Sequence, residues 1–165
     1  MKIAIIRRSF RFDGGAEKAL SNFITMYSDM GAEITLICES WSGKLSASVK
    51  IKNLPLRGSR ANRQNSFRRQ AQAYIGAQSF DHVQSHEWIP SVDIVRLGDG
   101  LHSKWLELFG DKKGRLWRFY SQLSPFHRQR VLDEMQTLCH PNLKTILVNS
   151  ELVRDQIEQQ YPSVV

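Results

Sequence analysis

Short continuous runs of apolar residues alternate along this chain with segments in which apolar residues recur every three or four positions. The continuous runs predict buried strands, whereas the three-to-four spacing predicts helices that bury one face. We expect strands at residues 2–7, 33–38, 49–54, 80–86, 92–97 and 144–148. We expect helices at residues 16–30, about 67–75, 125–140 and 151–161.

Turn and capping residues support several of these boundaries. Gly31 follows the first predicted helix in the position of a C-capping glycine, and Ser124-Pro125 is typical of a helix start. Residues 58–65 are basic and lack apolar spacing, so we expect a loop there. The helix after Pro125 is expected to bury its apolar residues, which are Val131, Leu132, Met135, Leu138 and Cys139.

The alternation of strands and helices predicts an α/β fold with an open parallel sheet. Strands that are continuous apolar runs are typical of parallel sheets covered by helices on both faces. The length of 165 residues and the hydrophobic content of 41% fit one globular domain with its own core.

Neither export nor membrane insertion is predicted. The chain lacks a run of about 18 apolar residues, the length that a transmembrane helix needs. Arg7 and Arg8 interrupt the apolar stretch near the N-terminus, so no signal peptide forms. Cys38 and Cys139 are too few for a disulfide framework and belong to no CxxC pair, which argues against a secreted scaffold and a zinc module. We therefore expect a reducing, cytoplasmic location.

The net charge of +7 comes from one quarter of the chain. Residues 40–80 hold eight basic side chains and no acidic one, whereas the remainder is close to balanced. Such a stretch attracts phosphate, nucleic acid or anionic lipid, and the alternative is a solvated face that binds nothing.

The turn between the first strand and the first helix is a candidate phosphate site. Gly14, Gly15 and Ala16 lie where this helix begins. Ligands of open α/β sheets bind beyond the carboxyl ends of the strands, and the free N–H groups of a helix N-terminus suit a phosphate. The dinucleotide and P-loop glycine spacings are both absent, so a tight turn without a ligand is the alternative.

Polar side chains stand at the ends of two later strands. His86 and Glu87 end the fourth predicted strand, and Asp99 lies between two glycines after the fifth, with His102 three positions later. A histidine or carboxylate in such a place can bind a ligand or transfer a proton. The alternatives are a hydrogen-bonded loop histidine and an ordinary Asx turn.

Residues 101–132 combine basic and aromatic side chains. This mixture suits a membrane interface or stacking on single-stranded nucleic acid, and a helix pair with an aromatic core is the third interpretation. The residues expected at a membrane surface are Lys112, Lys113, Arg115, Trp117 and Arg118.

Taken together and in this order, the motifs resemble the retaining family-four glycosyltransferases of GT-B fold. The start of that family is similar to IAIIRRSFRFDGGAEKAL followed by EITLICESW. Its strand ending in histidine resembles FDHVQSHEW, and the end of its first domain resembles TILVNSELVRDQIEQQYP. The branch that builds bacterial lipopolysaccharide cores is similar to RLGDGLHSKWLEL.

The resemblance implies a hexosyltransferase that moves a sugar from a nucleotide-sugar donor to a lipopolysaccharide-core or similar saccharide acceptor, with retention of configuration. The residues expected at the donor phosphates are Gly14, Gly15 and Ala16. The residues expected to be catalytic are His86, Asp99 and His102. The residues expected to bind the acceptor are Glu17, Lys18 and Glu87. The resemblance implies no metal and no cofactor besides the donor as co-substrate. It also places residues 101–132 on the inner face of the cytoplasmic membrane, near a lipid-linked acceptor.

The family's second domain, with a basic pair and two spaced glutamates, has no counterpart in these 165 residues. We therefore expect residues 1–165 to form a single Rossmann-like, acceptor-side domain, with the donor-binding C-terminal domain absent and the fragment inactive by itself. Two other classes remain open. One is a basic nucleic-acid-binding module, although no helix-turn-helix, RRM or zinc-finger pattern is visible and we expect no specific nucleic acid partner. The other is a flavodoxin-like regulatory domain, in which Arg7-Arg8 would replace an acidic cluster.

Overall fold

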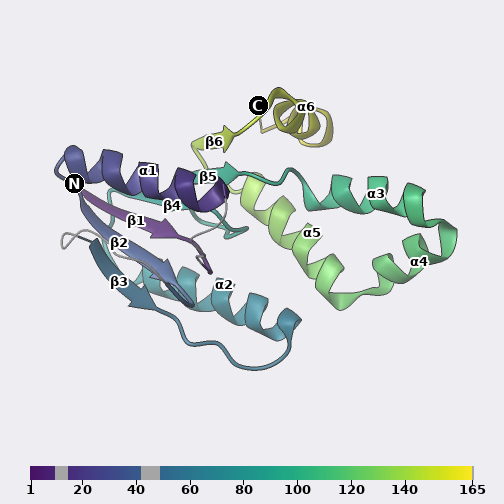
Figure 1. Cartoon of the computed structure of the whole chain (residues 1–165), viewed down its shortest axis with the longest axis horizontal. Coiled ribbons are helices and arrows are strands. Elements are labelled where there is room, and N and C mark those ends of the chain that lie inside the picture. Colours follow the sequence, from purple (N-terminus) through teal and green to yellow (C-terminus); the bar gives the residue numbers. More distant parts are fainter. Residues whose placement is uncertain (10–14, 42–48, 165) are drawn as a thin grey trace.

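The computed structural model describes residues 1–9, 15–41 and 49–164, and it has the expected α/β architecture (Figure 1). The strands are β1 (Lys2–Ile6), β2 (Glu33–Cys38), β3 (Val49–Asn53), β4 (His82–Ser85), β5 (Ile94–Leu97) and β6 (Thr145–Val148). The helices are α1 (Gly15–Asp29), α2 (Arg60–Gly76), α3 (His102–Lys113), α4 (Arg115–Leu123), α5 (Pro125–Leu138) and α6 (Glu151–Gln160).

All six strands form one parallel sheet in the order β3-β2-β1-β4-β5-β6. The chain builds outward from β1 through β2 to β3, and then crosses back to place β4 on the other side of β1. The strand order therefore reverses between β1 and β4. In open α/β sheets this switch point opens a crevice beyond the carboxyl ends of the strands, where ligands bind.

Helices cover both faces of the sheet. Alternate residues of β1 point to opposite faces, and each face packs against a different helix. Ile3 and Ile5 pack with Leu20 of α1. Ala4 and Ile6 pack with Phe67 of α2, which lies on the other side of the sheet in Figure 1. A third cluster joins β5 to α6 and to the end of α5, and it contains Val95, Leu97, Leu138, Val153 and Ile157.

The helices α3, α4 and α5 project from the sheet as one helical unit (Figure 1). The chain leaves β5, runs outward along α3, turns through α4 and returns along α5. The returning helix α5 contacts both α2 and α3. The unit therefore stands beside the crevice that the strand ends create.

The helix α2 begins earlier than the sequence predicts. The loop expected at 58–65 is wrong, because α2 starts at Arg60, directly after Ser59. The Ser59 side chain accepts a hydrogen bond from the Asn62 N–H at 3.4 Å, which caps the helix. The first two turns of α2 consist mostly of polar residues, so the spacing of apolar residues cannot reveal them.

The prediction for the face that α5 buries is wrong in part, since Leu138 is buried as expected but other apolar residues are not. Leu132 and Met135 are exposed, whereas Asp133, Glu134 and Thr137 are almost fully buried. The polar face is stable inside because its carboxylates have partners on other elements. Asp133 Oδ1 lies 3.2 Å from Arg68 Nε of α2, and Glu134 hydrogen-bonds the start of α3.

Both cysteines are free thiols, with Cys38 buried and Cys139 exposed. Burial raises the pKa of the Cys38 thiol to about 11. This thiol therefore stays protonated near neutral pH, where it is a poor nucleophile.

Candidate active site

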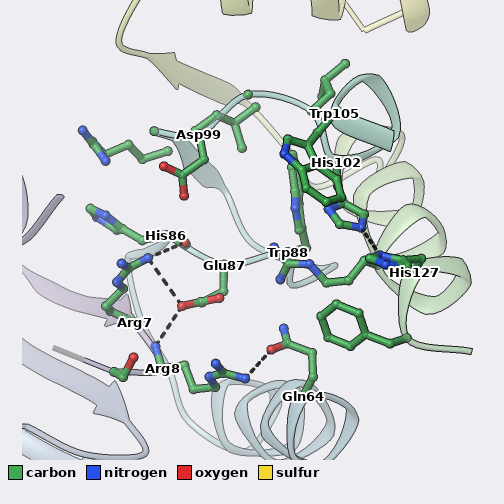
Figure 2. Close-up of a pocket in the computed structure, with 18 residues that line it drawn as sticks. Arg7, Arg8, Gln64, His86, Glu87, Trp88, Asp99, His102, Trp105 and His127 are labelled. Atoms are coloured by element: carbon green, nitrogen blue, oxygen red, sulfur yellow. Dashed lines mark hydrogen bonds and ion pairs between the residues drawn. The ribbon is translucent and has the colours of Figure 1, made fainter. Parts of the chain in front are cut away.

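A pocket of about 570 Å³ opens at the carboxyl ends of β1, β4 and β5 (Figure 2). Arg7 and Arg8 follow β1, His86 and Glu87 follow β4, and Asp99 lies in the turn after β5. The helical unit closes the other side of the pocket with His102, Trp105 and His127. The pocket therefore gathers side chains from segments that are distant in the sequence.

His86 is a buried histidine that stays neutral. Burial, with the nearby positive charges of Arg96 and Arg7, lowers its pKa to about 3. Its Nε2 lies 2.9 Å from Gln84 Nε2, and Gln84 Oε1 accepts a hydrogen bond from the Tyr27 hydroxyl at 2.8 Å. Because the Gln84 oxygen faces the hydroxyl, its amide nitrogen donates to His86 Nε2. This pattern assigns the proton of the His86 ring to Nδ1.

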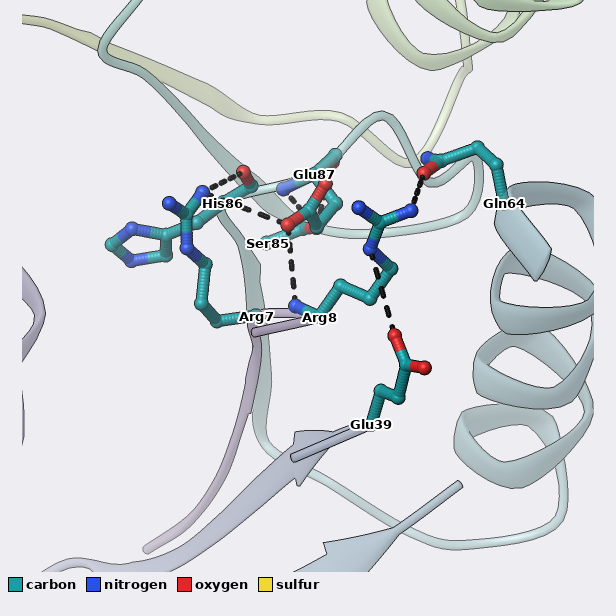
Figure 3. A network of polar contacts seen from close by, with 7 residues as sticks. All are labelled: Arg7, Arg8, Glu39, Gln64, Ser85, His86 and Glu87. Carbon is teal, nitrogen blue, oxygen red and sulfur yellow. Dashed lines mark hydrogen bonds and ion pairs between the residues drawn. The ribbon is translucent and has the colours of Figure 1, made fainter. Parts of the chain in front are cut away.

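Glu87 ties the ends of β1 and β4 together (Figure 3). Its Oε1 accepts a hydrogen bond from the Arg8 backbone N–H at 3.2 Å and lies 3.5 Å from Arg7 Nη1. The backbone N–H of Glu87 donates to Ser85 Oγ, whose hydroxyl donates to the Glu87 carbonyl. The Glu87 carboxylate is thus already held by the chain itself.

The two arginines after β1 also have partners. Arg7 Nη1 donates to the His86 carbonyl oxygen at 3.4 Å. Arg8 Nη1 donates to Gln64 Oε1 of α2 at 2.7 Å, and its Nε lies 3.9 Å from Glu39 (Figure 3). These contacts hold both guanidinium groups against the floor of the pocket.

Asp99 is exposed at the tip of the turn that follows β5, where it lines the pocket. The Asn149 side-chain amide donates to the Gly98 carbonyl at 2.8 Å and holds this turn. Gly100 has a φ of +74°, and a Cβ there would lie 3.1 Å from Gln156 Oε1. The positive φ therefore favours glycine at position 100, and a Cβ there would also require the Gln156 side chain to shift.

His102 begins α3 and faces the pocket from the helical side (Figure 2). Its Nε2 lies 3.0 Å from Nδ1 of His127, and its ring stacks on Trp105 with centroids 5.6 Å apart. The three residues expected to be catalytic, His86, Asp99 and His102, therefore line one pocket. Their roles in catalysis remain predictions.

The residues near α1 that were expected to bind the donor phosphates or the acceptor are not found among the described residues that line the pocket. Gly14 is outside the described residues, as are the side chains of Ala16 and Glu17, and Gly15 is the first residue of α1. Lys18 is exposed on α1 and does not line the pocket. Glu87 is the one acceptor candidate that does line it.

The large apolar residues of α3 and α4 include an inner and an outer set. Trp117 is half-buried and packs on Phe109 and Trp105, with ring centroids 5.1 and 6.1 Å away. This inner set packs α3 against α4, but it is not a buried core, because Trp105 is 42% exposed. The outer set is an apolar face of α4 with side chains 56–77% exposed, formed by Leu116, Phe119, Tyr120 and Leu123.

The other residues expected at a membrane surface are basic. Lys112 and Lys113 are exposed at the end of α3. The side chains of Arg115 and Arg118 are outside the described part of the chain. None of the helices described here is long and apolar enough to cross a membrane.

The basic stretch 40–80 is partly neutralised by acidic side chains from elsewhere. Arg63 pairs with Glu39, and Arg68 pairs with the buried Asp133. Charges that are paired in this way add little to a nucleic-acid surface, which weakens the nucleic-acid interpretation.

Several pocket residues have no sequence motif of their own. The pocket also contains Gln64, Arg96, His127 and Arg130. Arg96 interrupts an apolar strand, which was the one visible indication that a charged side chain faces a site. The others come from helices and meet the strand ends only through the fold.

Comparison with known proteins identifies the class to which this domain belongs. A family model described as Glycosyltransferase Family 4 matches residues 13–164. The chain therefore belongs to this family, and its Rossmann-like sheet is that of a domain of a GT-B glycosyltransferase. The resemblance found in the sequence is confirmed. Comparison with curated protein sequences gives no significant match.

Two solved structures are similar to this chain. The crystal structure of WaaG, a glycosyltransferase involved in lipopolysaccharide biosynthesis, has a TM-score of 0.84 at 15% identity, over 97% of this chain and 42% of WaaG. Apo UGT2 of Phytolacca americana has a TM-score of 0.51 at 11% identity, over 99% of this chain and 50% of that one. The chain thus spans half or less of the length of each. At these identities the likeness establishes the fold.

Proposed function

We propose that this chain is the acceptor-side domain of an enzyme that transfers a hexosyl group with retention of configuration. The donor would be a nucleotide sugar, and the acceptor a lipopolysaccharide-core or similar saccharide. The observation that carries the proposal is the convergence of His86, Asp99 and His102 on one pocket in a Glycosyltransferase Family 4 domain. WaaG, of similar fold, acts in lipopolysaccharide biosynthesis, which supports this acceptor class.

The pocket suits the binding and orientation of sugars. A neutral His86 offers its Nδ1–H as a hydrogen-bond donor to a sugar hydroxyl or a developing negative charge. Asp99 is an exposed carboxylate, which accepts hydrogen bonds from hydroxyl groups. Retaining transfer of this kind need not use a protein nucleophile, and the catalytic work assigned to these residues is to orient the two sugars.

The donor diphosphate is proposed to approach the N-terminus of α1, at Gly14, Gly15 and Ala16. A helix N-terminus presents free N–H groups and a partial positive charge to an anion. Glu17, Lys18 and Glu87 are proposed to contact the acceptor. We expect neither a metal nor a further cofactor to be required. A second, donor-binding domain is proposed to complete the enzyme, because WaaG is more than twice as long as the matched region.

We also propose peripheral association with the inner face of the cytoplasmic membrane. The outer face of α4 exposes four large apolar side chains, and Lys112 and Lys113 are exposed in the last turn of α3, just before α4. Apolar side chains next to lysines suit an anionic lipid surface. This arrangement would bring the pocket close to a lipid-linked acceptor.

The test is a transfer assay with the full-length enzyme. Labelled nucleotide sugars are supplied with bacterial lipopolysaccharide cores truncated at successive positions, and the anomeric configuration of the product is read by NMR. Transfer to one truncated core with retention supports the proposal. Absence of transfer from every donor, or inversion, would contradict it. The chain 1–165 assayed alone is expected to be inactive.

A further inference from the structure

Two arginines line the pocket without an ion pair or hydrogen bond in the described part of the chain. Arg96 lies on β5 and Arg130 on α5, so they reach the pocket from different walls. The other two arginines of the pocket, Arg7 and Arg8, are held by Glu87, Glu39 and Gln64. The pocket thus contains two guanidinium groups whose N–H donors the described residues do not use.

The backbone leaves room for the Arg96 guanidinium. A Cβ at Gly98 would lie 3.0 Å from Arg96 Nη1, so a larger residue at 98 would require the end of the Arg96 side chain to shift. The charge of Arg96 also contributes to the lowered pKa of His86. Arg96 therefore lies near His86, which is proposed to orient the sugars.

Arg130 is near three carboxylates, but each of them has another partner. Glu87 is bound to Arg7 and to the Arg8 backbone, Asp133 to Arg68, and Glu134 to the start of α3. Burial lowers the pKa of the Arg130 guanidinium, so this cation has lost part of its hydration. A partly desolvated guanidinium without a hydrogen-bonded anion is costly, and an anionic ligand would offset that cost.

We propose that Arg96 and Arg130 form a subsite for an acidic group, a phosphate or a carboxylate, on the saccharide acceptor. This inference rests on the proposed transferase function and narrows its acceptor to acidic saccharides. Guanidinium groups bind both anions through paired N–H donors, so the two share one recognition chemistry.

The position of the two arginines favours the acceptor over the donor. The donor diphosphate is proposed at the N-terminus of α1, which follows β1, whereas Arg96 and Arg130 belong to β5 and α5. The helix α5 is also joined to α4, whose outer face is proposed to meet the membrane that carries the acceptor.

The test measures binding of defined sugars to the full-length enzyme in the absence of turnover. The probes are glucose 6-phosphate, glucuronate and neutral glucose, with uridine diphosphate as the donor-side probe. We expect at least one acidic sugar to bind about tenfold or more tightly than glucose, because its hydrogen bonds are charge-assisted. The tighter binder of the two acidic sugars identifies the preferred acidic group as a phosphate or a carboxylate.

Substitutions then assign the effect to the two arginines. Arg96→Gln and Arg130→Gln are each expected to lower the affinity for the acidic sugar about tenfold and to leave that for glucose unchanged. Arg154→Gln is the matched control, because Arg154 is an exposed arginine on α6 outside the pocket. Circular dichroism checks the fold, and Arg96→Lys and Arg130→Lys replace any glutamine variant that does not fold, with a smaller expected loss because the charge remains.

Equal affinity for acidic and neutral sugars overturns the proposal, as does an unchanged affinity in the arginine variants. If the affinity of these variants for uridine diphosphate falls by the same factor as their affinity for the acidic sugar, the arginines bind the donor diphosphate. The assignment to the acceptor is then overturned. Failure of the transfer assay contradicts the enzyme proposal instead. The binding ratios do not depend on turnover, so the two failures are distinguishable.

Discussion

The carboxylate of Glu134 on α5 accepts a hydrogen bond from the backbone N–H of His102, the first residue of α3. The same oxygen lies 3.3 Å from the Ser103 N–H, and the other accepts from the Ser103 hydroxyl and, at 3.1 Å, from Tyr161. Leu101, the residue before α3, has no side-chain oxygen to cap the helix. Glu134 therefore caps α3 from another helix and holds His102 at the pocket.

Glu134→Gln is expected to lower the free energy of unfolding by roughly 1–3 kcal/mol, because the buried cap loses its charge and gains an amide among hydrogen-bond donors. Urea unfolding of the purified protein measures this difference. Glu158→Gln is the control, since Glu158 is an exposed carboxylate on α6 and its loss should cost less than about 0.5 kcal/mol. Equal effects of the two substitutions would show that Glu134 does not act as a buried cap.

Most of the sheet could be predicted from the sequence, because its strands are continuous apolar runs. The strand at Glu33–Cys38 has the predicted bounds, and the last helix, α6, begins at Glu151 as predicted. The polar face of α5 could not be predicted in this way. Apolar spacing assigns Leu132 to the interior, whereas the fold buries Glu134 because its partners come from α3 and from Tyr161, the residue after α6.

The candidate site was predictable only as far as it follows strand ends. His86 and Asp99 come directly after β4 and β5, where open α/β sheets place ligand-binding residues. His127 and Arg130 reach the same pocket from α5, and nothing in their sequence neighbourhood indicates contact with β4 or β5. Such contacts arise from the packing of the helical unit against the sheet.

The stability of the protein is expected to fall in mild acid because of His86. An unfolded histidine has a pKa near 6.5, whereas the folded pKa is about 3. Between these values the unfolded chain binds a proton at this position and the folded chain does not. The contribution of His86 to the unfolding free energy is therefore fully present above pH about 6.5 and falls by about 1.4 kcal/mol per pH unit below it.

Urea unfolding at pH 7, 6 and 5 measures this slope. His86→Gln removes the titrating group, so the variant should lose less stability between pH 6 and 5 than the wild type. His82→Gln is the control, because His82 is an exposed histidine on β4, the strand that His86 follows. A slope that His86→Gln does not change would mean that other groups cause the acid sensitivity.

Asp99 and His102 are expected to contribute to sugar transfer in the full-length enzyme. Asp99→Ala and His102→Ala should each lower kcat/KM by roughly tenfold to a hundredfold, because each removes a polar group from the pocket. Steady-state transfer rates measure the loss, and Asp155→Ala on the exposed side of α6 serves as the control. Turnover that is unchanged in both pocket variants would remove these residues from the active site.

The outer face of α4 gives the last prediction. Leu116, Phe119, Tyr120 and Leu123 recur at the three-to-four spacing of one helix face, and all are exposed. Phe119→Ser is expected to weaken binding to vesicles of anionic phospholipid by tenfold or more, because burying a large apolar side chain stabilises by about 1.5–3 kcal/mol. Vesicle co-sedimentation measures the partition, and raised salt should weaken it further by screening Lys112 and Lys113.

Two comparisons separate membrane binding from folding. Leu152→Ser removes an equally exposed apolar side chain from α6, away from α4, and should leave vesicle binding unchanged. Trp117→Ala is expected to lower the unfolding free energy, because Trp117 packs on Phe109 and Trp105, whereas Phe119→Ser should leave it nearly unchanged. If Phe119→Ser and Leu152→Ser bind vesicles as the wild type does, the outer face of α4 does not meet the membrane.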